Sequence, residues 1–233
     1  MTDSSPSLDL VLMRIGLFGG TFNPIHFGHL RAALEVKESF PLDQCYLIPA
    51  AIPPHKRNKD IVDADERLEM IQLAIEGYGG FVLSDVEMKR PGPSYTIDTV
   101  DIFRRRFGGN NELYWILGLD AFLEIHTWKS YRKLLQTLSF IVTARPGAGE
   151  PGRESGRRFL EDYLRSSVSA EYVYADDRDA FVHPSLCAVF VQNITLIDIS
   201  SSKIRELVQA GKPIHFLLPE RVENLIRSRG LYL

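Results

Sequence analysis

The chain has 233 residues, of which 45% are hydrophobic, a formal net charge of -3 and a mean hydropathy of -0.08. These values predict one large folded domain, or one domain with a small appendage. The slight acidity gives no support for broad binding to nucleic acid or to an acidic membrane, and no apolar run is long enough to span a bilayer. Cys45 and Cys187 are far apart in the sequence, which gives no sign of a disulfide framework and fits a reducing cytoplasm.

The first seven residues are polar, and the N-terminus lacks the basic start and apolar run of a signal peptide. We expect residues 1–12 to be a disordered extension and residues 13–233 to form a single domain. Met13 stands immediately before the first expected strand, so the sequence leaves open whether Met1 or Met13 is the biological start.

Short β-rich runs alternate with helical ones over the first two thirds of the chain. Strands are expected at 14–18, 44–48, 81–84, 113–117 and 139–143. Helical periodicity is expected over 30–36, and further helices after Asp63 or Asp65 and after Ser94, any of which can act as a helix cap. This alternation predicts an α/β fold, a Rossmann-like, doubly wound parallel sheet with helices on both faces, whose ligands bind beyond the carboxyl ends of the strands.

The last third of the chain is harder to interpret. Residues 148–158 are rich in Gly, Glu and Arg and are expected to form a mobile surface loop, and 149–179 is the least informative region. The segments 187–191 and 194–197 could be neighbouring strands. Helices at 201–209 and 219–228 are expected to form a small C-terminal helical part, about 201–233.

The most informative segment is Gly19–His29, which reads Gly-Gly-Thr-Phe-Asn-Pro-Ile-His-Phe-Gly-His. It joins the first strand to a helix, where free backbone N–H groups and the helix dipole favour an anion. Two glycines let the main chain approach a phosphate closely. His26 and His29 are three residues apart, so both would face one side of the helix entry. The pattern predicts a polyphosphate site with two imidazole donors.

Two plainer interpretations of this segment remain. It could be a tight strand-to-helix turn with two incidental histidines, because a glycine-rich turn alone is a weak signal. A zinc site on the histidine pair lacks support, because both cysteines are distant and no local cluster completes a ligand set.

A second motif, Ile199–Arg205, repeats this logic near the end of the chain. Three serines precede or open a helix, and Lys203 and Arg205 lie in its first turns. Hydroxyls, free N–H groups and two cations together suit a triphosphate. Taken alone, the segment could equally be a serine-capped surface helix with solvated charges.

Together these motifs resemble the nucleotidyltransferase superfamily that carries a His-x-Gly-His motif, and most closely its bacterial nicotinate-nucleotide adenylyltransferase family. The resemblance extends over nearly the whole chain from Met13 and is sparse only between 149 and 179. It also rests on 54–56, 92–99, 118–120, Trp128 and 145–147. In one departure, Ser202 stands where the family usually has threonine, and the hydroxyl is retained.

The resemblance implies adenylyl transfer from ATP to nicotinate mononucleotide in the cytoplasm, giving deamido-NAD and pyrophosphate, with Mg²⁺ carried by ATP and no protein metal site. It implies the catalytic residues His26, His29, Lys203 and Arg205. The implied ATP site comprises Gly19, Gly20, Thr21, Phe22, His26, His29, Gly118, Asp120, Ile199, Ser200, Ser201, Ser202, Lys203 and Arg205. The implied mononucleotide site comprises Asn23, Lys56, Ser94, Tyr95, Thr96, Trp128 and Arg145.

Some roles stay open. Asp120 could bind a ribose hydroxyl or simply cap a helix, and Trp128 could stack on the pyridine ring or pack structurally. Within the same fold the acceptor could instead be nicotinamide mononucleotide or phosphopantetheine, or the enzyme could transfer CMP. A non-catalytic nucleotide sensor is the rival from another class, and a homo-oligomer is compatible with the sequence. We expect a preference for the acid mononucleotide, with the carboxylate read by backbone N–H groups at 94–96.

Overall fold

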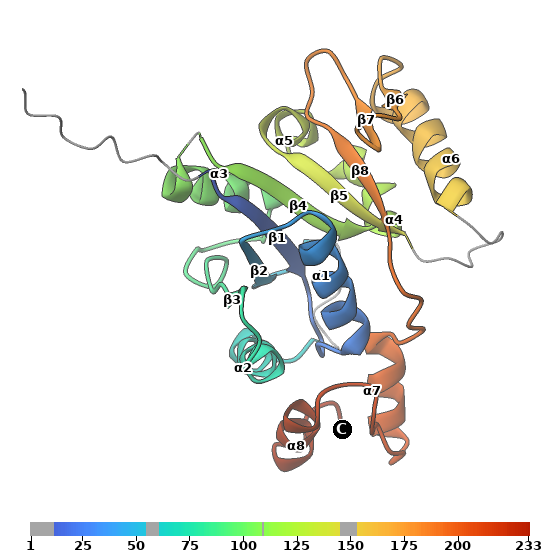
Figure 1. Cartoon of the computed structure of the whole chain (residues 1–233). Coiled ribbons are helices and arrows are strands. Elements are labelled where there is room, and N and C mark those ends of the chain that lie inside the picture. Colours follow the sequence, from blue (N-terminus) through green and yellow to red (C-terminus); the bar gives the residue numbers. More distant parts are fainter. Residues whose placement is uncertain (1–11, 55–60, 109, 145–152) are drawn as a thin grey trace, which may run out of the picture.

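The computed structural model describes residues 12–54, 61–108, 110–144 and 153–233, with side chains placed from residue 156 in the last of these ranges (Figure 1). The core of the fold is an eight-stranded sheet with the order β3-β2-β1-β4-β5-β8-β7-β6. The first six strands in this order are parallel, and β7 and β6 add antiparallel pairs at one edge. The predicted extension, residues 1–12, lies outside the described residues except for Leu12.

The predicted alternation of strands and helices is confirmed through residue 144. The strands are β1 Arg14–Gly20, β2 Gln44–Pro49, β3 Phe81–Leu83, β4 Glu112–Gly118, β5 Ser139–Ala144, β6 Val173–Ala175, β7 Ala180–Val182 and β8 Val189–Asn193. The α-helices are α1 Phe27–Ser39, α2 Ala64–Ile75, α3 Thr96–Phe107, α4 Leu119–Phe122, α5 Tyr131–Thr137, α6 Arg153–Tyr163, α7 Ser201–Gln209 and α8 Glu220–Ser228. A 3₁₀ turn, Ile125–Thr127, precedes α5, and a π-helical turn, Leu164–Val168, follows α6.

Hydrophobic side chains cover both faces of the sheet. On one face Ile15 and Leu17 of β1 belong to a buried cluster that also includes side chains of α3, α5 and α6, for example Phe103 and Leu160. On the other face Phe18 joins side chains of α1, α2, α7 and α8. Because strand side chains alternate between faces, β1 contributes to both layers. The doubly wound arrangement expected from the sequence is therefore confirmed, with α7 and α8 as the C-terminal helical part (Figure 1).

Three local predictions are wrong. Within the segment predicted as a surface loop, residues 153–158 belong to α6, and residues 145–152 lie outside the described part of the chain. The segment 194–197 is not a strand, because the pairing of β5 with β8 ends at Asn193 and the backbone N–H of Thr195 then donates to the Glu35 carboxylate (2.8 Å). Ser94 does not cap α3, which has Tyr95 at its N-cap position.

The two cysteines are both free thiols, as the sequence predicts. Burial on β2 raises the pKa of Cys45 to about 12, and burial also raises the pKa of Cys187. Both therefore stay protonated and unreactive near neutral pH. Across the described ranges, no helix is long and apolar enough to cross a membrane.

Candidate nucleotide-binding site

The sheet order creates a crevice between β1 and β4. The chain leaves β1 toward β2 on one side, whereas β4 flanks β1 on the other, so the strand order reverses at this point. Ligands of open α/β sheets bind at such a switch point, beyond the carboxyl ends of the strands. A cavity of about 720 Å³ opens there and is lined by residues of both strand ends and of the segments that follow them.

The glycine turn at the end of β1 forms one wall of this cavity. A side chain on Gly19 would collide with the Trp115 ring, since its Cβ would lie 2.5 Å from Cζ2. A side chain on Gly20 would meet the Phe22 ring at 2.9 Å. Aromatic packing therefore requires both glycines, in addition to any need for close approach by a phosphate. Gly19, Gly20, Thr21 and Phe22 all line the cavity, as predicted.

The two histidines of the motif stand at the entry of α1. His26 occupies the N-cap position and is buried, and its carbonyl accepts the His29 backbone N–H (2.9 Å). The ring centroids are 3.7 Å apart, with 33° between the ring planes. Gly28 leaves room for this arrangement, because its Cβ would lie 3.0 Å from His26 Nδ1. The prediction that both rings face one side is confirmed, and His29 is the one that lines the cavity.

A buried arginine that the sequence did not single out ties this wall together. Arg67 on α2 is 1% exposed. Its guanidinium donates to the carbonyls of Thr21 (2.9 Å), Ala50 (2.7 Å), Ala51 (3.3 Å) and Val62 (3.1 Å). Burial lowers its pKa, and the nearby Tyr232, Asp63 and Glu87 oppose that shift. One side chain thus links the loops that follow β1 and β2.

Asn23 acts as a second tie and not as part of the cavity wall. It is buried, and its Oδ1 accepts hydrogen bonds from the Tyr232 hydroxyl (3.0 Å) and from the Val62 backbone N–H (3.3 Å). Burial raises the pKa of Tyr232, so this hydroxyl remains a donor. The last residues of the chain therefore hold the turn that follows β1.

The second motif packs against the first and lies outside the cavity lining. Ser200 caps α7 by accepting the Lys203 backbone N–H (3.2 Å), and the Ser201 hydroxyl donates to the Pro24 carbonyl (2.8 Å). Arg205 donates to the Asn23 carbonyl (2.9 Å) and to the Ser202 hydroxyl (3.3 Å). Lys203 is exposed, with Glu206 3.5 Å away. The structure brings the two motifs together through backbone contacts, and the two cations do not reach the cavity wall.

The opposite end of the cavity is built from the start of α3 and the segment before α5. Ser94 pairs with Ile52: its backbone N–H donates to the Ile52 carbonyl (2.9 Å), and its hydroxyl accepts the Ile52 N–H (3.2 Å). This pairing replaces the predicted helix cap. Tyr95, Thr96 and Trp128 line the cavity, and Trp128 also packs on the hydrophobic core, so the same side chain lines the cavity and contributes to core packing.

Gly118 and Asp120 lie where β4 ends and α4 begins, and both line the cavity. Asp120 lies in the first turn of α4, but no side-chain cap bond is made there. A Cβ on Gly118 would lie 2.5 Å from Asp120 Oδ1, so glycine allows the carboxylate to fold back. Over the described residues, no group of three or more His, Cys, Asp or Glu side chains is arranged to hold a metal ion.

The predicted site residues therefore divide into three groups. Eleven line the cavity: Gly19, Gly20, Thr21, Phe22, His29, Ser94, Tyr95, Thr96, Gly118, Asp120 and Trp128. Eight lie behind or beside this lining: Asn23, His26, Ile199, Ser200, Ser201, Ser202, Lys203 and Arg205. Lys56 and Arg145 lie outside the described residues.

A mostly parallel sheet with a glycine turn and paired histidines at its switch point defines a nucleotide-binding α/β protein of the nucleotidyltransferase class. Accordingly, a family model described as cytidylyltransferase-like matches residues 17–207. In structure the chain resembles the Plasmodium falciparum nicotinic acid mononucleotide adenylyltransferase complexed with NaAD. The TM-score is 0.69 and the identity 18%, over 94% of this chain and 97% of that one. The same enzyme complexed with APC gives a TM-score of 0.67 at 17% identity, over 94% and 97%.

Sequence relatives narrow the class. A probable nicotinate-nucleotide adenylyltransferase from Desulfatibacillum aliphaticivorans is 45% identical over 223 residues, which is 95% of this chain and 100% of the relative. One of the same name from Pseudomonas fluorescens is 41% identical over 220 residues, 94% of this chain and 97% of the relative. The chain belongs to the nicotinate-nucleotide adenylyltransferase family.

Proposed function

We propose that the protein transfers the adenylyl group of ATP to nicotinate mononucleotide and so makes deamido-NAD and pyrophosphate. The observation that carries this proposal is the composition of the cavity. One end has a glycine turn and His29 at a helix entry, and the other has aromatic side chains beside the start of α3. The first end suits a polyphosphate, and the second suits a pyridine ring. A volume of about 720 Å³ lies within the range of small-molecule sites.

The reaction needs positioning more than proton transfer. The phosphate of the mononucleotide is already an oxyanion at neutral pH. One of its oxygens attacks the α-phosphorus of ATP in line, the new P–O bond forms, and the bond to pyrophosphate breaks with its electron pair on the leaving oxygen. Catalysis then consists of alignment and of donors aimed at the charge that develops on the α-phosphate. We assign that donor role to His29.

His26 differs from His29 in burial and therefore in its proposed role. It is at the N-cap position behind the cavity wall, and its ring stacks on His29 at 3.7 Å. It supports the His29 ring and adds a second imidazole to the phosphate end of the site. Asp120, which folds back over Gly118 at the cavity wall, is placed to accept a hydrogen bond from a ribose hydroxyl.

For the β- and γ-phosphates we propose Lys203, Arg205 and Lys56. Lys203 is exposed and pairs along its own helix with Glu206 at 3.5 Å, a weak surface interaction, so its side chain can turn toward a bound triphosphate. Arg205 reaches a phosphate by exchanging its bond to the Asn23 carbonyl. On the acceptor side we propose as the mononucleotide site Asn23, Lys56, Ser94, Tyr95, Thr96, Trp128 and Arg145, with the first N–H groups of α3 facing the carboxylate.

Mg²⁺ enters this proposal as part of the nucleotide substrate. In nucleotide sites its ligands are phosphate oxygens and waters, with one or two protein carboxylates, and the ion neutralises charge on the triphosphate.

A pyrophosphate-release assay across acceptors tests the proposal. With ATP as donor, we expect rapid release with nicotinate mononucleotide, much slower release with nicotinamide mononucleotide, and none with phosphopantetheine. Chromatography should identify deamido-NAD as the second product. Fast pyrophosphate release with phosphopantetheine would show that phosphopantetheine, and not nicotinate mononucleotide, is the acceptor. ATP binding without pyrophosphate release on any acceptor would favour a non-catalytic nucleotide sensor.

A further inference from the structure

A cluster of three charged side chains lies beside the acceptor end of the cavity. Lys129 lines the cavity next to Trp128, and its ammonium is 4.4 Å from the centroid of the Tyr95 ring. The same ammonium is 3.2 Å from Asp98 Oδ2. Arg90 Nη1 is 2.7 Å from that same oxygen. We propose that this cluster makes Lys129 the residue that selects the acid mononucleotide over its amide. The inference rests on the proposed function and deepens it.

The cluster carries surplus positive charge, because two cations share one carboxylate. Arg90 also has its Nε and Nη2 atoms buried without a hydrogen-bond partner among the described residues, and its ion pair is with Asp98. The other carboxylate in the cavity lining near this end, Glu87, accepts the Thr99 hydroxyl (2.6 Å). Glu87 also acts electrostatically on the buried guanidinium of Arg67, where it opposes the lowering of that pKa by burial. Glu87 thus faces a cation of its own in Arg67, and the cluster of Lys129, Arg90 and Asp98 keeps two positive charges against one negative charge.

The two candidate acceptors differ in the charge that they present to this cluster. The pyridine ring of both mononucleotides is a cation. In the acid form the ring carboxylate cancels that charge, whereas in the amide form the ring remains positive. A surplus positive charge at the ring end repels the amide form and attracts the carboxylate. The cluster thus adds electrostatic discrimination to the backbone N–H groups of α3, which by themselves can also accept an amide oxygen.

Lys129 is held in place for this task. The Tyr95 ring face and the Asp98 carboxylate bind its ammonium from the α3 side, which limits the entropy lost when a ligand arrives. About half of the side chain is exposed, so the interaction is screened by salt. Its effect should therefore be moderate and dependent on ionic strength.

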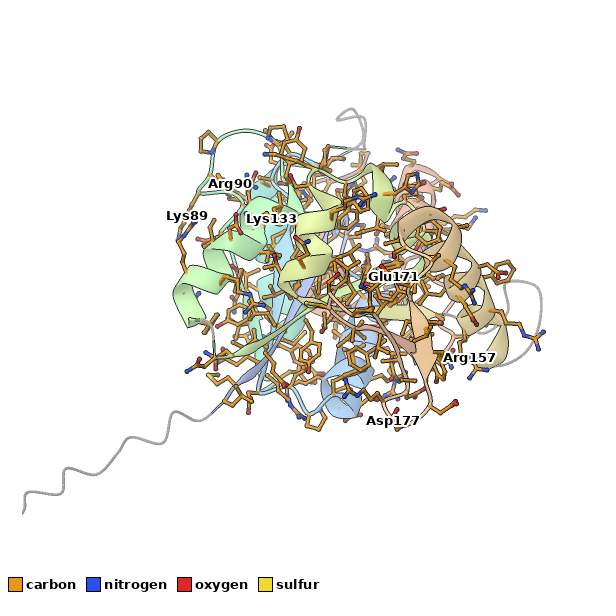
Figure 2. All side chains as sticks on the ribbon, turned by 90° about the horizontal axis from the view of Figure 1, so that it is seen from above. Lys89, Arg90, Lys133, Arg157, Glu171 and Asp177 are labelled. Carbon is orange, nitrogen blue, oxygen red and sulfur yellow. The ribbon has the colours of Figure 1, made fainter. Side chains whose placement is uncertain are left out.

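The chain offers a matched control about one helical turn away. Lys133 on α5 pairs with Asp101 of α3 at 2.9 Å and is similarly exposed, but neither residue lines the cavity. Figure 2 labels Lys133 and Arg90 near α3 and α5. Lys133→Met removes the same charge and the same kind of ion pair to an aspartate of α3, from α5 and not from the segment before it. It leaves the cavity lining unchanged.

The test is the ratio of kcat/KM for nicotinate mononucleotide to that for nicotinamide mononucleotide. Lys129→Met should lower the ratio by about fivefold to tenfold, the scale of one partly screened charge interaction. Lys129→Arg should keep the wild-type ratio, and Lys133→Met should leave it unchanged. Asp98→Asn should raise the ratio, because it removes the only negative charge of the cluster. In the wild type the ratio should fall at high ionic strength, and in Lys129→Met it should depend less on salt.

The outcomes separate the inference from the function on which it rests. If the wild type shows no preference for the acid, the proposed acceptor is wrong. If the wild type prefers the acid but Lys129→Met keeps the wild-type ratio, Lys129 is not the selecting residue and the function stands. An equal fall in the ratio for Lys133→Met would also overturn the inference, because a general loss of surface charge would then explain it. Should Lys129→Met fail to fold, the salt dependence of the wild type and the effect of Asp98→Asn still decide.

Discussion

The residues of the phosphate end were predictable because their chemistry is local. Glycines after a buried strand, followed by two histidines at helical spacing, define a turn and a helix entry without any knowledge of the rest of the fold. Arg67 was not predicted, because an arginine in an amphipathic helix is usually solvated. A signal was nevertheless present: Arg67 shares the buried face of α2 with Met70, Ile71 and Ala74, at the spacing of an apolar stripe.

His29→Ala should leave the protein folded and able to bind ATP but lower turnover by roughly two to four orders of magnitude, the scale for losing a preorganised donor. The check is kcat from pyrophosphate release, with ATP affinity measured by calorimetry. His126→Ala is the control, since His126 contacts Tyr163 and does not line the cavity. Near-normal kcat in folded His29→Ala would show that His29 is not the donor to the α-phosphate.

Arg67→Met should lower the free energy of unfolding by about 3 kcal/mol, because it leaves four partly buried carbonyls without this donor. It should also raise the KM for ATP, because Thr21 loses its support. Denaturant titration and steady-state kinetics measure the two effects. Arg221→Met, a change on the exposed surface of α8, is the control. Unaltered stability would show that the loops hold their shape without this tie.

At the level of elements, the sequence predicted the helices and strands whose own apolar residues recur at helical or strand spacing. The central strands, α2, α7 and α8 carry their own apolar patterns, and their boundaries fall close to prediction. The short strands β6 and β7 could not be predicted, because three residues carry no periodicity and form strands only through pairing with β8. The segment 194–197 has strand-like residues, yet it leaves the sheet toward α1, where Thr195 meets Glu35.

The two cations of α7 should be separable by experiment. Lys203→Ala and Arg205→Ala should each weaken ATP binding by roughly 1.5–3 kcal/mol, as expected for charge-assisted hydrogen bonds. Only Arg205→Ala should also lower the melting temperature, because Arg205 holds the Asn23 carbonyl whereas Lys203 is exposed. Calorimetric binding and thermal melts measure the two effects, with Lys212→Ala as the control beyond the end of α7. Unchanged ATP affinity in both variants would show that α7 is a capped surface helix with no role in ATP binding.

At the scale of the whole molecule, the alternation of strands and helices predicted the doubly wound sheet, but it did not predict the strand order or the contact between the two motifs. That contact joins residues about 180 positions apart in the sequence: Ser201 hydrogen-bonds to Pro24, and Arg205 hydrogen-bonds to Asn23. Local pattern carries no information on such a distant pairing. Residues 13–233 are proposed to unfold as one unit, because both hydrophobic layers share the same sheet.

Removal of residues 1–12 should change neither the melting temperature nor turnover appreciably, because we expect this segment to be a disordered extension that packs on nothing. The truncated chain should still unfold in a single calorimetric transition. The measurement is differential scanning calorimetry of both chains, with pyrophosphate release as the check of activity. A large loss of stability would show that residues 8–12 extend β1. Two unfolding transitions would show that residues 13–233 do not form a single domain.

The central claim is that the cavity at the β1–β4 switch point brings the α-phosphorus of ATP to the phosphate of nicotinate mononucleotide. Incubation with ATP that is radiolabelled at the α-phosphate and with nicotinate mononucleotide tests this most directly. The label should move into deamido-NAD in wild-type protein and at a rate lower by two to four orders of magnitude in His29→Ala. Label that stays in ATP, or that appears as free AMP without dinucleotide, would contradict the account.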